Sequence, residues 1–502
     1  MKPHACPVGA LLSLILFMTS IAASQQAARI VELPLPNSPL VSFRIEIRSG
    51  SVDDPKGKEG LNALTTAMIG QGGSKSHSYQ EIVGILYPWA ARIGAQSDKE
   101  VTTIVAEVHR DHLEEFYGIL WELLTAPRFD PEDFSRNRDE LVNYLTNSLR
   151  GNDDENLGKA GLNLLMYADH PYKNVPEGTV QGLGAITLDD VKAYHAKMVT
   201  QSRIVFGIAG GYPKGFIDRV KQDLATLPTG TFTPVALPAP RAPQGVEGMI
   251  IQKDNRATAI SFGYPIDVTR SDKDYYALLV ANSYLGEHRT FNGVLMNHLR
   301  GDRGLNYGDY SYIENFIQDG GSTFPIPNIP RRQQFFSVWI RPVEPKNAQF
   351  ALRAALHEVH LLVEKGLRKE EFEATREFVI NYSKLWVQTQ SRRLGYLMDS
   401  EFYGTPYYID EVARQLSALT VDDVNAAIRR HLQAKNFYLS IVAKDAVPLR
   451  DALISETPSP IQYNNPNVPP DVLAQDKIIE VLPVGINKSR FPIVSSSDLF
   501  ER

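Results

Sequence analysis

Apolar residues recur along this chain with two periods, an alternation typical of strands and a longer repeat typical of helices. Two strand-like runs, Val41–Arg48 and Thr258–Tyr264, each open a long stretch in which helices and strands follow one another. Each stretch is predicted to run strand, helix, strand, helix, helix, strand, and to end at Ser202–Ala209 or Asn436–Ala443. This order is typical of a sheet covered by helices on one face. The fold class is therefore predicted to be α+β.

The two stretches resemble one another as a diverged internal duplication. Glu132–Arg138 matches Glu370–Arg376, and Ile186–Val191 matches Leu419–Val424 at nearly the same offset. Two collinear matches at nearly constant offset are specific, whereas a single match would be weak. The chain is therefore predicted to contain two homologous halves.

Local signals mark the ends of helices and the boundaries of domains. Thr187 and Thr420 are expected to be helix N-caps, because each precedes an Asp pair that suits the positive first turn. Between the halves lies a segment that cannot be an element interior, since prolines recur along it. We predict a signal at 1–24, an N-terminal half at 25–226, a proline-rich linker at 227–245, a C-terminal half at 246–455 and an extended tail at 456–502.

The first 24 residues have the features of a secretory signal peptide. A short basic start precedes an apolar run from Ala10 to Ile21, and small residues follow at Ala22–Ser24. The one cysteine, Cys6, precedes the apolar run, so the mature chain would contain no disulfide. Export without disulfides favours a bacterial periplasm or cell surface.

Charge and hydropathy exclude several classes of partner. The formal charge of −6 becomes −7 when the signal is removed, because Lys2 is lost and no acidic residue is. Such a balance disfavours nucleic acid and anionic lipid. No later run is long and apolar enough to span a membrane. With 43 % apolar and 22 % charged residues, the composition is typical of a globular protein.

The most informative segment is Gly60–Ile69, which closely resembles a motif of the pitrilysin/insulinase family of zinc metallopeptidases, Gly-Leu-x-His-x-x-Glu-His. In this alignment the first His falls on Ala63, the Glu on Thr66 and the second His on Ala67. These positions share one helix face. Neither Ala nor Thr offers zinc a usable lone pair. The resemblance therefore implies that the helix is kept and the zinc site is lost.

The third zinc ligand of that family is missing as well. It would be a Glu near Tyr144–Thr146, in a helix that begins near Pro131. No carboxylate occurs there, and Glu140 lies about one helical turn too early. Two ligands, a general base and a third ligand are thus absent together, so the chain is not expected to hydrolyse peptides alone.

The second half keeps a different motif of the same family. His298–Tyr307 resembles the segment Leu-Arg-x-x-x-x-Leu-x-Tyr, and a helix from Asp274 to Leu299 is predicted to lead into it. In active members the Arg and the Tyr reach the zinc site of the other half, contact the substrate backbone and help to stabilise the oxyanion. Arg300 and Tyr307 match both in type and in spacing, and both side chains are suitable donors. The alternative is that Arg300 is a solvated helix-end cation and that Tyr307 packs on a strand.

The resemblance implies two halves, of the kind found in the mitochondrial processing peptidase and LuxS, that face one another like a clam shell. Some bacterial members of the family work as two chains, one with the zinc helix and one with the Arg/Tyr pair. This chain resembles the second kind. We therefore expect a non-catalytic subunit that needs no cofactor of its own. A homologous zinc-bearing partner would hold the metal, and peptides or unfolded polypeptides would be the substrate.

Two other functions remain open. One is a catalytically inert binding or scaffold protein of the cell envelope. The other is a self-sufficient metalloenzyme that uses unexpected His ligands, such as the pairs His109/His112 and His357/His360. Both pairs are interpreted as surface or capping residues.

Two further segments carry weaker signals. In active relatives, the strand pair matching Ile93–Val108 binds extended peptide, but Ala95–Ser97 replaces the family's Asn-Ala there. Peptide docking is therefore possible but not favoured. The tail is either disordered or a strap on a neighbouring domain or subunit.

Overall fold

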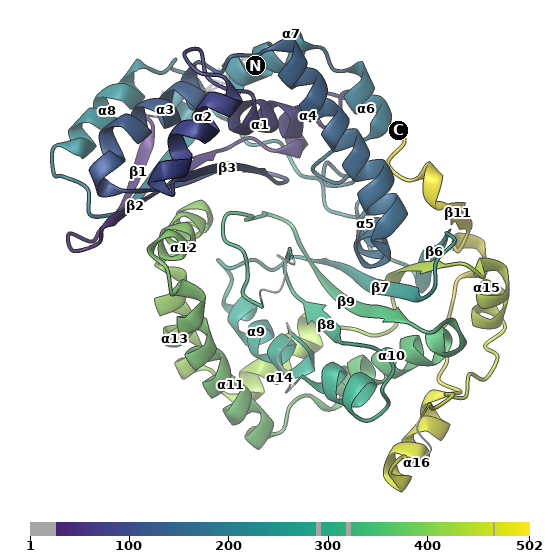
Figure 1. The fold of residues 1–502 in the computed structure, drawn as a ribbon. Helices are drawn as coiled ribbons and strands as arrows, with labels where there is room; N and C mark the ends of the chain where they lie inside the picture. Colours follow the sequence, from purple (N-terminus) through teal and green to yellow (C-terminus); the bar gives the residue numbers. More distant parts are fainter. Residues whose placement is uncertain (1–26, 288–292, 318–322, 465–466) are drawn as a thin grey trace, which may run out of the picture.

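A computed structural model describes residues 27–287, 293–317, 323–464 and 467–502. Two α/β halves lie one above the other in Figure 1, and each is built around one sheet. The prediction of an α+β fold with two halves is confirmed. The predicted signal at 1–24 lies outside the described residues. Within those residues, no helix has the length and apolar character needed to cross a membrane.

The N-terminal half contains a five-stranded sheet in the order β1-β5-β2-β4-β3. β1 runs parallel to β5, and the other neighbours are antiparallel. The strands are β1 (Arg29–Pro34), β2 (Leu40–Ile47), β3 (Arg92–Ser97), β4 (Thr102–His109) and β5 (Ile204–Gly210). The helices are α1 (Leu61–Gln71), α2 (Tyr79–Leu86), α3 (Leu113–Thr125), α4 (Pro131–Asn143), the π-helix η4 (Tyr144–Asn152), α5 (Asp154–Met166), α6 (Val180–Ala185), α7 (Leu188–Met198) and α8 (Phe216–Thr226).

The C-terminal half contains a six-stranded sheet in the order β11-β6-β10-β7-β9-β8. Its strands are β6 (Val246–Gln252), β7 (Thr258–Ile266), β8 (Asp309–Tyr312), β9 (Gln334–Val343), β10 (Phe437–Ala443) and β11 (Ile493–Ser495). Its helices are α9 (Lys273–Leu285), the π-helix η6 (Met296–Gly301), α10 (Ala348–Lys365), α11 (Lys369–Ser383), α12 (Gln390–Tyr403), α13 (Tyr408–Ala418), α14 (Val421–His431) and α15 (Ala446–Ile454), and the tail adds α16 (Pro470–Ile479).

The two sheets share one topology, which confirms the internal duplication. Apart from β11, each strand of the second sheet takes the place of the strand five numbers earlier in the first. The parallel pair β6 and β10 repeats β1 and β5. The helix starts also match, because Thr187 and Thr420 each cap a helix by accepting a hydrogen bond from the backbone N–H three residues on. Both N-cap predictions are confirmed.

One helix from each half packs on the sheet of the other half. α5 of the N-terminal half lies on β10 and β7, and α12 of the C-terminal half lies on β5 and β2 (Figure 1). Small residues allow the close approach of α5, because a Cβ at Gly161 would lie 2.5 Å from Ser440 Oγ. Alternate residues of β2 divide between the two sides, since Phe43 faces the half's own core while Arg44 bonds to α12. The two halves are therefore held together by a helix packed on each sheet, an arrangement here called cross-braced.

One predicted helix is wrong in extent. The helix expected from Asp274 to Leu299 ends at Leu285, and Gly286 follows it. A separate π-helix, η6, then carries the motif residues. The apolar repeat continues through Leu295 and Leu299 because both pack into the same core, although they belong to another element. An apolar repeat indicates which residues are buried, and here it did not indicate that the helix ends at Leu285.

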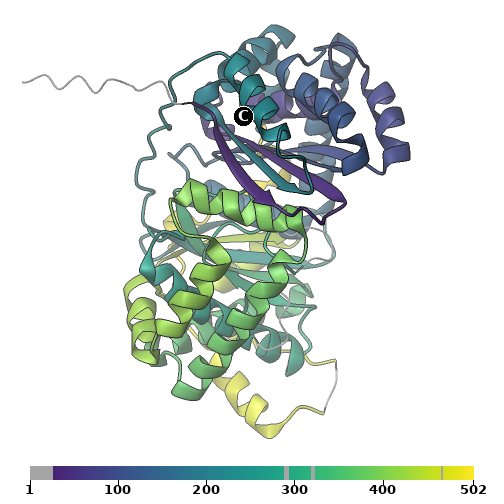
Figure 2. The same ribbon diagram turned by 90° about the vertical axis from the view of Figure 1, so that its left-hand side faces the viewer.

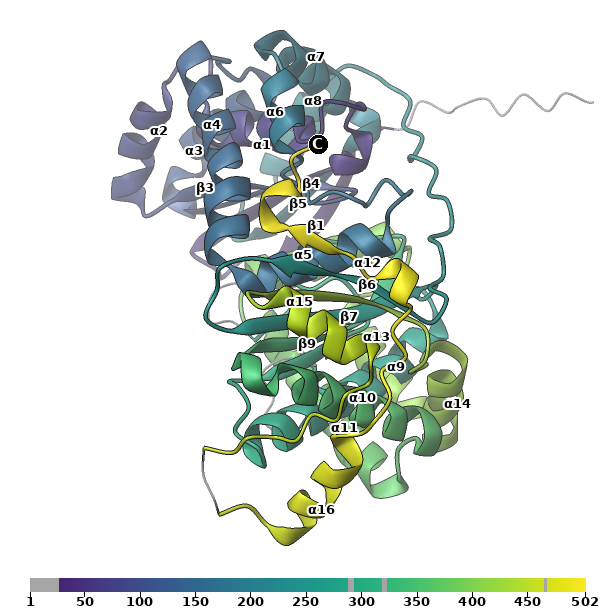
Figure 3. The same ribbon diagram turned by 90° about the vertical axis from the view of Figure 1, so that its right-hand side faces the viewer.

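The linker and the tail run along the outside of both halves. Residues 227–245 form no helix or strand and descend beside the halves in Figure 2. The tail contains α16, which contacts α10 and lies at the bottom of Figure 3, so the tail is not extended throughout. It then adds β11 in parallel to β6 and buries Leu499 and Phe500 in the core of the N-terminal half. The tail thus joins the halves.

Candidate functional site

The degenerate zinc motif lies on α1, on a helix face that is largely buried. Ala63 and Thr66 are buried, and Ala67 is half-buried. The helix begins at Gly60, whose φ of 105° requires glycine. Asp54 caps this end, because its carboxylate accepts hydrogen bonds from the backbone N–H groups of Gly60 at 2.8 Å and Asn62 at 2.7 Å. Burial raises the pKa of Asp54 to about 7.

Neutral hydrogen-bonding groups lie beside these motif positions. Thr66 donates to the carbonyl of Asn62 at 2.8 Å. The carboxamide of Asn62 accepts from Ser97 and, at 3.1 Å, from Thr102, and it donates to Tyr194 at 3.3 Å. None of these groups is an imidazole, thiolate or carboxylate. The network satisfies buried polar atoms and offers zinc no ligand.

The position expected for the third ligand lies where α4 passes into η4. Tyr144 begins η4 and is 37 % exposed. Glu140 is turned to solvent, where it pairs with Arg136 at 3.3 Å. A π-helix inside a longer helix often marks a functional site, because it re-aims side chains. Here the π-helix begins with a tyrosine and contains no carboxylate.

The residues present do not fit a zinc ion. In the described parts of the chain, no three His, Cys, Asp or Glu side chains gather as a metal site would require. The two His pairs do not supply one. His109 caps a turn by accepting from Asp111 N, whereas the ring of His112 stacks on Trp89 at 4.8 Å. His360 contacts the carbonyl of Leu356 at 2.8 Å within its own helix.

Arg300 and Tyr307 lie on the stretch that joins α9 to β8. Arg300 is half-buried near the end of η6. Tyr307 is 80 % exposed, so the alternative that it packs on a strand is wrong. The chain turns back between them, because Gly304 N donates to Arg300 O at 2.9 Å. Neither residue lines the cavity between the halves, so their catalytic role remains a prediction.

A cavity of about 250 Å³ lies between the halves. Trp339 and Phe335 form an aromatic wall from the C-terminal half, and α5 provides Lys159 on the facing side. The Lys159 ammonium lies 3.8 Å from the centre of the Trp339 ring and pairs with Glu155 at 2.8 Å. Tyr144 also lines this cavity. The cavity therefore adjoins the lost zinc site without containing a metal ligand set.

The local sequence gave no signal for the charged turn at Asp98–Glu100. All three side chains are buried, although three successive charges normally mark a solvated turn. Asp98 pairs with Arg331 of the other half at 2.7 Å, and Glu100 pairs with Arg332. Burial lowers the pKa of Lys99, which lies between them, to about 7. Only the position of the other half explains the burial.

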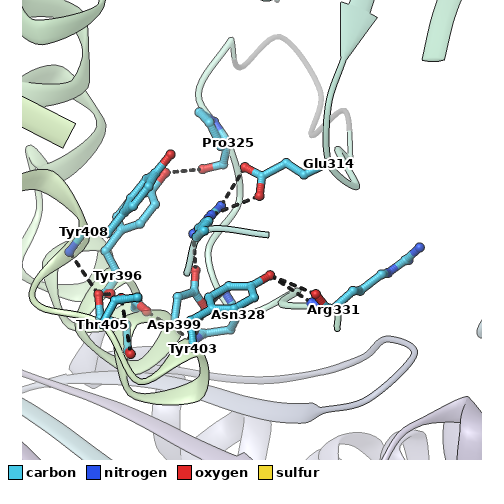
Figure 4. A network of polar contacts seen from close by, with 12 residues as sticks. Glu314, Pro325, Asn328, Arg331, Tyr396, Asp399, Tyr403, Thr405 and Tyr408 are labelled. Atoms are coloured by element: carbon cyan, nitrogen blue, oxygen red, sulfur yellow. Dashed lines mark hydrogen bonds and ion pairs between the residues drawn. The ribbon is translucent and has the colours of Figure 1, made fainter. Parts of the chain in front are cut away.

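A second buried network surrounds Asp399 of the C-terminal half (Figure 4) and is joined to the N-terminal half through Arg44. Arg270 donates to both oxygens of Glu314, at 3.0 and 2.9 Å, and to Asp399 at 3.1 Å. Asp399 accepts from Asn328 N at 2.8 Å, and Asn328 in turn accepts from Arg44 of β2 at 2.6 Å. Burial raises the pKa of Asp399 to about 6. With the Asp98 pair, this network holds the halves closed.

Comparison with protein-family models gives two matches along the chain. Residues 29–174 match the model described as insulinase (peptidase family M16), and residues 185–379 match the peptidase M16 inactive domain. The first match covers most of the N-terminal half, and the second runs from the end of that half into the C-terminal half. They leave the tail outside both models.

Known proteins resemble most of the chain. The non-peptidase homolog YmxG of Helicobacter pylori is 22 % identical over 408 residues, which cover 81 % of this chain and 89 % of that protein. An uncharacterized zinc protease of Streptomyces coelicolor is 23 % identical, over 85 % of this chain and 90 % of its own length. The crystal structure of a peptidase M16 inactive domain from Pseudomonas fluorescens has a TM-score of 0.73 at 21 % identity, over 83 % of this chain and 95 % of that chain.

Proposed function

This chain belongs to the insulinase family, peptidase family M16, without the residues of its zinc site, and we propose that it is the non-catalytic subunit of an exported zinc metallopeptidase. A homologous partner would hold the zinc, its ligands and the general base. This chain would close the chamber and present Arg300 and Tyr307 to the bound peptide. Export to a periplasm or cell surface rests on the signal-like residues 1–24.

One combination carries this proposal. Positions 63, 66 and 67 hold no zinc ligand, while the Arg/Tyr pair is kept at its full spacing. Tyr307 is exposed and Arg300 is half-buried, so the Tyr307 side chain is accessible to another molecule. Guanidinium and phenol groups are donors for a developing oxyanion, but neither group supplies the attacking nucleophile. Under this proposal, a water bound to zinc on another chain would supply it.

The cross-braced halves constrain where the substrate would bind. Buried ion pairs and the exchanged helices α5 and α12 hold the two halves together, and the cavity between them is about 250 Å³. That volume is below the range of about 300–1,000 Å³ that is usual for ligand pockets. The chamber would therefore form between this chain and its partner, and folded proteins would be too large to enter it.

The proposal is tested by mixing the purified mature chain with a homologous protein that carries the zinc motif, here called the zinc-motif protein, chosen as the one encoded nearest to this chain. Hydrolysis of an unstructured peptide library is measured for each protein alone and for the mixture, together with the mass of the complex by sedimentation. We expect hydrolysis in the mixture only. A mixture no more active than the zinc-motif protein alone would count against the proposal.

The cavity favours a second candidate, a catalytically inert binding or scaffold protein of the cell envelope. Its aromatic wall and the adjoining Lys159 form a site of the kind that holds a small ligand. Under this function Trp339→Ala would abolish ligand or partner binding, and Arg300→Ala would change nothing. The subunit function gives the opposite ranking when hydrolysis by the mixture is measured.

A further inference from the structure

The segment His298–Tyr307, here called the Arg/Tyr segment, is held by a buried cation between its two functional residues. The Arg303 side chain is fully buried, and each of its nitrogens has a partner. Nη1 donates to the carbonyl of His298 at 2.8 Å, which closes the segment on itself. Nε donates to Asp476 at 2.8 Å, and Nη2 donates to Gln475 at 2.7 Å. Two of the three acceptors of these hydrogen bonds therefore belong to α16 of the tail.

Both carboxylate oxygens of Asp476 accept hydrogen bonds in this contact region. Its side chain is 4 % exposed, and its second carboxylate oxygen accepts from the hydroxyl of Tyr463. A buried charge that loses its partner is strongly destabilised, so α16 and Arg303 constrain each other. α16 also packs on α10, where Glu358 holds His298 at 2.8 Å. The tail, α10 and the start of the segment thus form one rigid cluster.

The other end of the segment is fixed separately. Asn306 donates to Asp309 at 2.7 Å and to the carbonyl of Arg341 at 3.0 Å, and it accepts from Gly308 N at 3.0 Å. These bonds hold the backbone on either side of Tyr307, while its ring remains exposed. The Cα position of Tyr307 is therefore set by the backbone, and the exposed ring is accessible to another molecule. This arrangement suits a residue that acts on another molecule.

We propose that α16 is a positioning element for Arg300 and Tyr307, with Asp476 and Gln475 acting through Arg303. The inference rests on the proposed function, in which both residues must meet a transition state on the partner. α16 lies outside the residues matched by the family models, which end at 379. The loss of its ion pair would misplace the segment without unfolding the halves.

The test compares Asp476→Asn with Asp476→Glu, which restores the charge, and with Leu473→Ala, on the exposed face of the same helix. Amide hydrogen exchange of residues 296–308 is measured on the full mature chain alone. We expect exchange to rise by about tenfold or more in Asp476→Asn, to fall back toward wild type in Asp476→Glu, and to stay unchanged in Leu473→Ala.

The second readout is peptide hydrolysis by each variant mixed with the zinc-motif protein. Misplacement of groups that act in the transition state should lower kcat by about 10- to 100-fold and leave KM within about twofold. A merely structural role would lower the amount of complex without changing kcat per complex. Should Asp476→Asn fail to fold, Tyr463→Phe removes one bond to the carboxylate and should give the same changes at smaller size.

Unchanged exchange at 296–308 in folded Asp476→Asn overturns the inference, as does an unchanged kcat with increased exchange. A wild-type mixture without hydrolysis counts against the proposed function alone. In that case the exchange data still decide whether α16 holds the segment, because they need no partner.

Discussion

Asp98 of the N-terminal half and Arg331 of the C-terminal half form a buried ion pair in which one guanidinium donates to both carboxylate oxygens. The distances are 3.0 Å from Nε to Oδ2 and 2.7 Å from Nη2 to Oδ1. Both side chains are at most 6 % exposed. Because the pair lies where the two halves meet, it contributes to their relative placement as well as to stability.

Arg331→Met is expected to lower the free energy of unfolding by about 3–5 kcal/mol, since it leaves Asp98 buried without its partner. Urea denaturation checks this. Lys444→Met is the matched control, because the Lys444–Asp254 pair is largely exposed and should be worth at most about 1 kcal/mol. A cost equal to that of the control would mean that the Asp98 pair does not hold the halves.

Restoring the lost motif should not restore the metal. In Ala63→His, Thr66→Glu, Ala67→His we expect less than stoichiometric zinc, because a catalytic zinc takes three protein ligands and no carboxylate lies at 144–146. The buried Ala63 and Thr66 positions should also be overpacked, at a cost of about 1–3 kcal/mol. Zinc per chain is measured by elemental analysis, with the same variant plus Thr146→Glu for comparison. One zinc per chain in the triple variant would contradict this.

Glu46 should make stability fall with rising pH. Burial raises its pKa from 4.5 to about 8, against the opposing charges of Arg48 and Arg29 and with Asp399 and Glu401 adding to the rise. Between pH 4.5 and pH 8, Glu46 is protonated in the folded state and ionised in the unfolded state. Its contribution to the free energy of unfolding is therefore fully present below pH 4.5 and is lost as the pH rises to 8.

Glu46→Gln removes that dependence. Relative to wild type, the variant should gain about 4 kcal/mol more at pH 8.5 than at pH 5, because the pKa of Glu46 rises from 4.5 to about 8 and each pKa unit is worth about 1.4 kcal/mol. Thermal unfolding at both pH values checks this, with the exposed Glu370→Gln as control. An equal effect at the two pH values would show that Glu46 is ionised when folded.

The end of the tail should be part of the N-terminal core. Phe500 is 3 % exposed and has a φ of 56°, a strained conformation that burial of its ring offsets. Its carbonyl accepts from Val180 N at 2.9 Å. Phe500→Ala should therefore cost about 3–5 kcal/mol in urea denaturation. Deletion of Arg502 alone should cost almost nothing, and equal costs for the two changes would contradict the packing.

The sequence was most informative where local chemistry decides the structure. The strands at Val41 and Thr258 and the caps at Thr187 and Thr420 depend on alternation and on a side-chain oxygen, both visible in a few residues. The duplicated pattern also predicted the shared topology. The lack of zinc ligands at positions 63, 66 and 67 follows from residue type alone, and the expectation that this chain holds no zinc remains a prediction.

What the sequence could not give depends on contacts between distant segments. α5 packs on the sheet of the C-terminal half, and α12 packs on the sheet of the N-terminal half. The apolar pattern of a helix predicts a buried face but not the sheet that covers it. Asp98–Glu100 has the composition of a solvated turn and is buried only because Arg331 and Arg332 lie opposite. The bond from Arg303 to Asp476 spans 173 residues and has no local signal.

The most direct test of the subunit function is the kcat of the mixture with the zinc-motif protein, measured for wild type and Arg300→Ala. Arg368→Ala serves as control, because that cation is 77 % exposed and pairs within its own helix start. We predict a loss of about 10²- to 10³-fold for Arg300→Ala, as for a lost oxyanion donor, and no loss for the control. An Arg300→Ala mixture as active as wild type would contradict the central claim.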